Sequence, residues 1–475
     1  MDIAIINTWV LSVREKNLRI TQKGAIGIVE GTLVYVGPTE GFNYKNANIL
    51  IDGTDHVTMP GLINAHVHTN STLLRGAAQD IPEIEWMNKG IGPLYEHLTQ
   101  EDITLGSKLG VLEGLRTGTT TFAEYAKNVE NLVENVYLPF HVRVVAAETI
   151  NEINLNRAHL KPTDLYEFDR SKGNRAFQRG TELFQKFKNH DLVHCMYGPQ
   201  ALDMISLDLL ETIKEKTREQ ETKMHMHIAQ GRRERIQIIG RYGKGSSTVK
   251  ILDRHGFLDK HLLAVHCHDT TEQERKLMVE REVNFVCCPS SIGMIDGIIP
   301  PIHNFAALGG SVGLGTDQTP GPGHQNMFRE MRTACILSKV NEKDPTAFPP
   351  WNALRAATLD GAKILGLAEK IGSLDVGKRA DVITFNLRQP HLTPSISSPF
   401  HNFIPNIVYS AYGNEVDNVI IDGKLIIFEG RFVDIDQKNL LDRAQKSANE
   451  IFKRAKDDWI NANSQFIKYI KEGWL

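Results

Sequence analysis

The central part of the chain alternates short apolar runs with longer stretches of helical periodicity. Stretches such as 101–118 and 206–220 place apolar residues three or four positions apart, which is typical of helices that cover a parallel sheet. The apolar runs read as eight strands, at residues 58–68, 119–125, 142–150, 191–200, 223–230, 262–269, 283–291 and 310–317. Eight strands with intervening helices predict an α/β protein built on a (β/α)8 barrel.

The two ends of the chain have a different pattern. Residues 1–56 read as short strands with turns, and strands of the same kind return in 372–387 and 416–433. We expect the segments 1–56 and 370–433 to form a small β-sandwich that flanks a barrel of residues 57–369. Residues 434–475 have the pattern of an amphipathic helix that packs onto the body.

Composition narrows the class of protein. The 475 residues are 41% hydrophobic and 23% charged, with a formal net charge of −3 and no dominating basic or acidic block, so neither nucleic acid nor a membrane surface is an expected partner. No apolar run reaches the roughly 18 residues that span a bilayer, and the N-terminus lacks the features of a signal peptide. The five cysteines are odd in number and show no CxxC pairing, which favours a reducing compartment. We therefore expect a cytoplasmic protein.

Histidine and aspartate gather near the carboxyl ends of the predicted strands, where functional side chains of such barrels project. His66 and His68 lie two positions apart on one strand and point the same way. Imidazole and carboxylate groups bind Zn²⁺ and similar ions, and a catalytic site uses three or four protein ligands. His227 and Asp317 can complete such a set, whereas His225 lies one layer deeper. Each motif alone also fits a buried structural histidine or a turn, but together they predict a catalytic metal site.

Several segments resemble the amidohydrolase superfamily: "PGLINAHVHTNSTLLRG", "HMHIAQ", "AVHCHD", "VGLGTD" and "GSLDVGKRADVITFNL". They are most similar to the branch that contains methylthioadenosine/S-adenosylhomocysteine deaminases, atrazine chlorohydrolase and melamine deaminase. The resemblance implies one divalent metal ion per chain, Zn²⁺ in first place with Fe²⁺, Co²⁺ or Mn²⁺ as alternatives. It also implies a homodimer or homotetramer.

The resemblance further implies roles for particular residues. The metal ligands are His66, His68, His227 and Asp317. Asp317 also takes the proton of the attacking water, and His266 contacts the substrate or that water. Trp86 resembles a tryptophan that lines the pocket in this branch, although a packed loop anchor is an equal alternative.

The chain departs from the branch at positions that bear on the substrate. Gln230 stands where the deaminases carry a glutamate that shuttles a proton to a ring nitrogen, and an amide has no such proton to transfer at neutral pH. Gln200 replaces a histidine of the adenosine-type enzymes, and Ile292 gives an apolar lining after the seventh strand. We expect Gln230 to be catalytic or to orient the substrate, together with contacts from Trp86, Gln200 and Ile292.

Three glutamates could take over the proton shuttle. Glu234 follows Gln230 by four positions, but its arginine neighbours favour a solvated, salt-bridging face. Glu124 and Glu148 lie near the ends of the second and third strands.

The predicted function is a metal-dependent hydrolase of a small nitrogen-containing substrate. The metal and Asp317 generate hydroxide, which attacks an electrophilic carbon and breaks a carbon–nitrogen bond other than a peptide bond. The alternatives are deamination of an N-heterocycle or nucleoside-like substrate, and hydrolytic dechlorination of a chlorotriazine-like compound. A descendant that only binds a ligand is disfavoured, because the complete residue set is retained.

Overall fold

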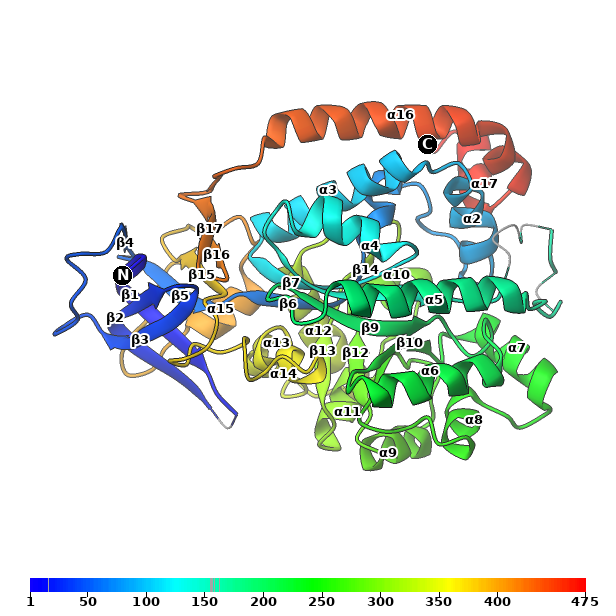
Figure 1. The fold of residues 1–475 in the computed structure, drawn as a ribbon, viewed down its shortest axis with the longest axis horizontal. Coiled ribbons are helices and arrows are strands. Elements are labelled where there is room, and N and C mark those ends of the chain that lie inside the picture. Colours follow the sequence, from blue (N-terminus) through cyan, green and yellow to red (C-terminus); the bar gives the residue numbers. More distant parts are fainter. Residues whose placement is uncertain (16, 154–156, 158, 162) are drawn as a thin grey trace.

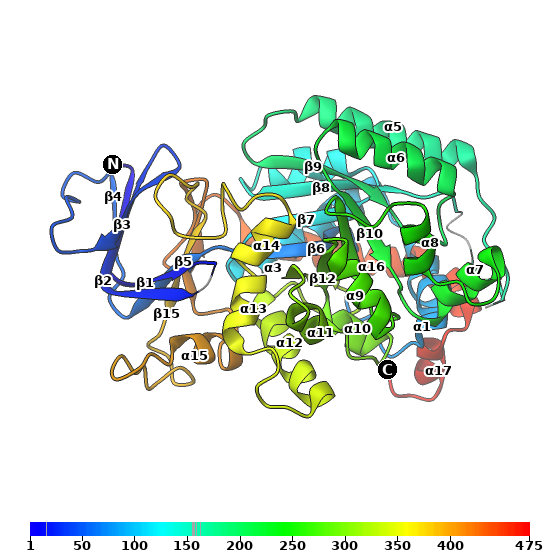
Figure 2. The ribbon, with the colours of Figure 1, turned by 90° about the horizontal axis from the view of Figure 1, so that it is seen from below.

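The computed structural model describes residues 1–475 except 16, 154–156, 158 and 162. Its centre is a parallel barrel whose strands follow one another in chain order (Figures 1 and 2). The strands are buried on both faces, as expected when helices cover a parallel sheet. They are β6 (Leu62–His68), β7 (Thr119–Ala126), β8 (Arg143–Ile150), β9 (Val193–Pro199), β10 (Met224–Ile228), β11 (Leu262–His266), β12 (Asn284–Cys287), β13 (Val312–Leu314) and β14 (Asp317–Gln318).

The eighth strand is interrupted, and its two parts close the barrel. β13 pairs with β12, whereas β14 pairs with β6, placing Asp317 opposite Val67. A Cβ on Gly315 would lie 2.7 Å from the carbonyl oxygen of His66, so the crossing between the two parts requires glycine. Barrel closure therefore brings Asp317 beside the strand that carries His66 and His68.

Helices alternate with these strands, as the periodicity predicts. Two of them, α3 (Gln100–Arg116) and α9 (Glu272–Glu280), begin with capping boxes at Thr99 and Thr271. After the first strand come η1 (Thr69–Leu74), α1 (Glu83–Glu85), η2 (Trp86–Ile91), α2 (Gly92–Tyr95) and α3 (Gln100–Arg116). The others up to residue 409 are α4 (Val129–Leu132), η3 (Val133–Tyr137), α5 (Arg170–Lys186), α6 (Leu207–Glu219), α7 (Arg232–Tyr242), α8 (Thr248–Arg254), α9 (Glu272–Glu280), α10 (Pro289–Ile295), α11 (Ile302–Ala307), α12 (Met327–Glu342), α13 (Pro350–Ala356), α14 (Leu359–Ile364) and α15 (Phe403–Tyr409).

Strands from both ends of the chain form a second, mixed sheet beside the barrel (Figure 1). The link between the ends is antiparallel pairing of β5 with β15, with Val57 opposite Phe385. The sheet contains β1 (Ile3–Val13), β2 (Leu18–Val29), β3 (Thr32–Pro38), β4 (Ile49–Asp52), β5 (His56–Pro60), β15 (Val382–Asn386), β16 (Val416–Ile421), β17 (Lys424–Phe428) and β18 (Arg431–Phe432). The predicted barrel with a flanking β-module from both ends is confirmed, while the residue limits of the parts stay predictions.

One predicted strand is two. Residues 58–68 contain β5 of the flanking sheet and β6 of the barrel, separated at Gly61. A Cβ on Gly61 would lie 2.2 Å from the Thr120 hydroxyl oxygen, so the chain passes from one sheet to the other at a point where no side chain fits. Because both strands are apolar, the sequence pattern runs on through residues 58–68 and does not show the break between them.

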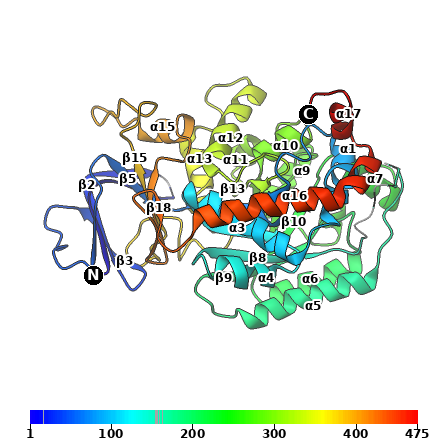
Figure 3. The same cartoon turned by 90° about the horizontal axis from the view of Figure 1, so that it is seen from above.

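The C-terminal segment lies along the outside of the barrel. Figure 3 shows α16 (Gln437–Ala462) running along α3, followed by α17 (Gln465–Lys471). Leu440 and Ile451 are buried in this contact, and Ser447 donates a 2.5 Å hydrogen bond to Asp102 of α3. None of the described helices combines the length and the apolar character that crossing a membrane requires.

Candidate metal centre and active-site cavity

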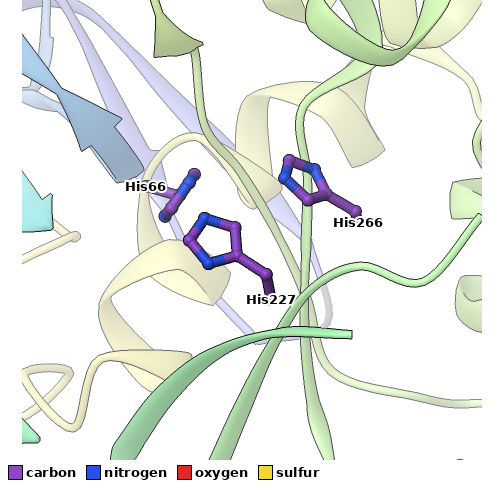
Figure 4. A group of neighbouring side chains, drawn as sticks. All are labelled: His66, His227 and His266. Carbon is purple, nitrogen blue, oxygen red and sulfur yellow. The ribbon is translucent and has the colours of Figure 1, made fainter. Parts of the chain in front are cut away.

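Buried imidazoles meet at the carboxyl ends of β6, β10 and β11. Figure 4 shows His66, His227 and His266 with their rings turned toward one another. Asp317 enters from β14, and its Oδ1 lies 3.6 Å from Nε2 of His66 and 3.4 Å from Nε2 of His68. The structure thus brings together five of the predicted site residues at the position where functional groups of a barrel converge.

Carbonyl groups behind the rings set the orientation of two histidines. His68 donates from Nδ1 to the carbonyl of Tyr125 at 2.6 Å, and His227 donates from Nδ1 to the carbonyl of Gln200 at 2.9 Å. Their Nε2 atoms therefore carry lone pairs in the neutral rings, and these two atoms face each other at 3.4 Å. Two lone pairs at this distance repel unless a cation lies between them.

The donor set fits a divalent metal ion. Nε2 of His66 is buried without a hydrogen-bond partner among the described residues, while its Nδ1 contacts Nε2 of His225 at 2.8 Å. Two overlapping groups have ligand atoms within 4.8 Å of one another: His66 with His227 and His266, and His66 with His68 and Asp317. Imidazole nitrogens joined by one carboxylate are ligands that Zn²⁺ prefers.

Burial keeps the imidazoles in the neutral form that metal binding requires. Burial lowers the pKa of His227 to about 4 and holds the pKa of His66 well below its ordinary value, with the neighbouring histidines acting in the same direction. Burial also lowers the pKa of His266. In the absence of a metal these rings are uncharged at neutral pH.

Asp317 is held from the side away from the histidines. The Ser291 hydroxyl donates to its Oδ2 at 2.6 Å, and the Gln325 amide donates to its main-chain carbonyl at 3.3 Å. Asp317 has a positive φ of 60°, and His266 has a φ of 75°. Both strand ends thus adopt the left-handed backbone that L-residues rarely adopt, and such outliers cluster at functional sites.

A small cavity of about 60 Å³, partly open to solvent, opens beside these groups. The cavity includes five of the predicted site residues, because Trp86, Gln230, His266, Ile292 and Asp317 line it. The Trp86 indole N–H is bound to the carbonyl of Ala78 at 3.0 Å, so the ring presents its apolar surface.

Gln200 lies outside the cavity lining. Its side-chain oxygen accepts a hydrogen bond from Asn151, and its carbonyl holds the ring of His227. The structure therefore places Gln200 behind the candidate metal ligands, where it orients a ring, and its predicted contact with substrate gains no support.

Glu234 is not the solvated residue that its arginine neighbours suggested. It is 1% exposed, and its carboxylate accepts from the backbone N–H of Ala229 and of Gln230, and from Thr248. The Gln230 side-chain amide lies 3.5 Å from the same carboxylate. The buried strand end needs an acceptor for its free N–H groups, and Glu234 supplies it from α7.

The other two glutamates are also engaged away from the cavity lining. Glu124 accepts from the backbone and hydroxyl of Thr69 and from Tyr137 at 2.5 Å, and burial raises its pKa to about 7. Glu148 accepts from the backbone of Val129 and forms an ion pair with Arg179. Neither lies where a substrate in the cavity would meet it.

Several polar residues near the cavity are not among the predicted site residues. Glu83, Arg233, His268 and Asp296 line it, and Asp203 lies behind Arg233 in a buried ion pair. His268 follows His266 by two positions, which was a usable signal. Glu83 begins the three-residue helix α1 and Asp296 follows α10, and because no periodic pattern predicts where these residues lie, their positions depend on tertiary packing.

Known proteins share this architecture. Residues 57–426 match the profile of the amidohydrolase family. A 5-methylthioadenosine/S-adenosylhomocysteine deaminase of Desulforudis audaxviator is 33% identical over 454 residues, which are 95% of this chain and 99% of the relative. The crystal structure of an adenosine deaminase of Xanthomonas campestris with bound zinc superposes with a TM-score of 0.85 at 28% identity, covering 95% and 99% of the two chains. That of the atrazine chlorohydrolase TrzN of Arthrobacter aurescens TC1 with zinc gives 0.80 at 18% identity, covering 94% and 100%, a likeness of fold.

Proposed function

The chain belongs to the amidohydrolase family, and from this premise we propose that it hydrolyses a carbon–nitrogen bond, other than a peptide bond, in a small N-heterocyclic substrate and releases ammonia. The observation that carries the proposal is the convergence of His66, His68, His227 and Asp317 at one end of a cavity that also contains His266 and Gln230. The deaminase relative supports an amino group as the leaving group.

Under this proposal one divalent ion, Zn²⁺ in first place, is held by His66, His68, His227 and Asp317. The zinc in the related adenosine deaminase and the facing Nε2 atoms of His68 and His227 support this assignment. When bound, the ion supplies a Lewis acid that lowers the pKa of water and polarises the attacked group.

The protein groups then have separate tasks. Asp317 takes the proton from the attacking water, and the Ser291 hydroxyl fixes its carboxylate during this transfer. His266, whose Nδ1 has no partner among the described residues, hydrogen-bonds to the attacking oxygen and orients it toward the carbon. As the oxygen–carbon bond forms, the electron pair of the attacked C=N bond moves to the ring nitrogen. Protonated Asp317 then gives its proton to the amino nitrogen, the electron pair returns to the ring, and the bond from carbon to the leaving nitrogen breaks.

Gln230 separates this site from a deaminase that protonates a ring nitrogen. Its amide can donate to or accept from the substrate, but it has no proton to transfer. This favours substrates whose ring is already electron-poor. The lack of a transferable proton at Gln230 is also the observation that supports a second candidate function, hydrolysis of a triazine-like compound that loses chloride or an alkylamine.

Metal analysis combined with a substrate panel tests the proposal. We expect one zinc equivalent per chain in the wild-type protein and loss of both metal and turnover in His68→Ala. Mass spectrometry separates the two functions, because deamination releases ammonia, whereas the second function releases chloride or an organic amine. A metal-loaded protein that hydrolysed no member of a panel of amino-heterocycles, ureas and chlorotriazines would contradict the proposal.

A further inference from the structure

Three polar side chains of the cavity wall take no part in the proposed reaction. They are Glu83 of α1, His268 after β11 and Asp296 after α10, and all three line the cavity. They converge in front of Gly231. A Cβ on Gly231 would lie 3.1 Å from Nε2 of His268, 3.2 Å from Oδ1 of Asp296 and 3.7 Å from the carboxyl carbon of Glu83. Glycine at this position, with a φ of +105°, keeps the space in front of the three groups clear.

His268 is the member that requires a partner. The residue is 9% exposed, and its side chain is fully buried. Neither ring nitrogen has a hydrogen-bond partner among the described residues, and the nearest ion-pair contact is Asp296 at 3.5 Å. Because a buried unsatisfied polar group is costly, an imidazole in a cavity wall implies that a ligand or ordered water completes its hydrogen bonds.

The charge of this wall is negative. Arg233 is the cation that lines the cavity, and its guanidinium is bound to Asp203, which is fully buried. The guanidinium also pairs with Glu83, 3.7 Å from Nε to Oε1, and the backbone N–H of Arg233 donates to the Glu83 carboxylate. Arg233 therefore shares its charge between Asp203 and Glu83, and among the described lining residues no arginine or lysine pairs with Asp296.

We propose that Glu83, His268 and Asp296 form a subsite for a cationic, hydrogen-bond-donating group of the substrate, of the guanidinium or alkylammonium class. This inference rests on the proposed function, since it names the substrate class of the same cavity. Two carboxylates accept the charge-assisted hydrogen bonds of such a group, which are about twice as strong as neutral ones. The same carboxylates repel a phosphate or carboxylate on the substrate.

Calorimetry with matched probes tests the subsite without requiring turnover. The probes are butylguanidinium and its neutral near-isostere butylurea, each titrated into the zinc-loaded wild-type protein at neutral pH. A guanidinium has no lone pair available for a metal, so its binding reports on the cavity wall. We expect butylguanidinium to bind at least about tenfold more tightly than butylurea.

Two variants and one control test which residues cause the preference for butylguanidinium. Asp296→Asn and Glu83→Gln should each reduce the preference for butylguanidinium by about fivefold or more, with unchanged circular dichroism. Asp269→Asn is the matched control, because Asp269 follows His268 directly but pairs with Arg235 outside this cavity. It should leave the preference unchanged. Equal binding of butylurea, or a preference that survives both variants, would overturn the subsite.

Turnover distinguishes failure of the subsite from failure of the proposed function. Two amino-heterocycles that differ only in a guanidinoalkyl arm serve as substrates. We expect Asp296→Asn to raise KM for the compound with the arm by a larger factor than KM for the compound without it. Hydrolysis of both compounds with no effect of Asp296→Asn would uphold the proposed function and refute the subsite. If the protein preferred butylguanidinium but hydrolysed neither compound, the subsite would be upheld and the proposed function would be refuted.

Discussion

Replacing Gln230 by glutamate restores a carboxyl group at the position where this cavity lacks a proton carrier. The Gln230 amide nitrogen lies 3.5 Å from the buried carboxylate of Glu234. Two carboxylates at this separation repel by about 5 kcal/mol at an effective dielectric constant of about 20. Since one pKa unit corresponds to about 1.4 kcal/mol, the upper bound is a rise of roughly three and a half units.

Partial exposure of position 230 to solvent reduces this repulsion. We therefore expect a rise of about two units, which brings the pKa of the new carboxyl to roughly 6.5. A group with this pKa is suited to exchange protons at neutral pH, and general acid–base catalysis contributes about 10²–10⁴-fold. The assay is the pH dependence of kcat/KM for an amino-heterocycle that the wild-type protein hydrolyses slowly.

The variant should gain about tenfold or more in kcat/KM, with a new limb in the pH profile between about pH 6 and 7. Gln273→Glu, the same substitution on the exposed surface of α9, is the control and should change neither. An unchanged rate and pH profile in a folded, metal-loaded Gln230→Glu protein would refute the reasoning and make Gln230 a bystander.

Three further predictions follow from the ion pairs and carboxylates of the site. Asp317→Asn should lower kcat/KM by about 10³-fold while the protein stays folded, and a rate within about tenfold of wild type would contradict its role as base. Arg233→Met removes the ion-pair partner of the buried Asp203 and should lower the free energy of unfolding by about 3–5 kcal/mol in urea titrations. Arg235→Met breaks an exposed ion pair and should cost less than about 1 kcal/mol; equal losses would show that burial is not the cause. Burial raises the pKa of Glu83 to about 7 against the opposing charge of Arg233, so affinity for butylguanidinium should increase from about pH 6 to pH 8 as Glu83 ionises, and a flat profile would exclude it from the subsite.

The pattern of apolar runs was sufficient to predict the barrel. Buried parallel strands are apolar on both faces, so each run ends close to where the strand ends, and His66, His68, His227, His266 and Asp317 follow at the correct edge. The resemblance to the amidohydrolase branch that these motifs indicated is confirmed. The roles of the individual residues stay predictions until the variants are measured.

Contacts between residues that are far apart in the sequence could not be predicted from local sequence patterns. Glu234 lies among arginines in the sequence, yet it is buried because two backbone N–H groups at the end of β10 need an acceptor. Arg233 is buried for a related reason, since Asp203 arrives from a different loop. Such pairings depend on which loops lie next to each other in the fold, and the spacing of apolar residues in the sequence does not predict this.

Pairing of β5 with β15 has a consequence for protein synthesis. All strands of the barrel are translated before β15 (Val382–Asn386). During synthesis the sheet formed by residues 3–60 therefore has an unpaired edge at β5 until β15 has been made. An open edge of this kind is a template for association with other chains. Residues 382–428 therefore cap the N-terminal strands as well as ending the fold, and a chain that stops before them exposes that edge permanently. Such a truncated chain would retain every candidate metal ligand and still be prone to aggregate.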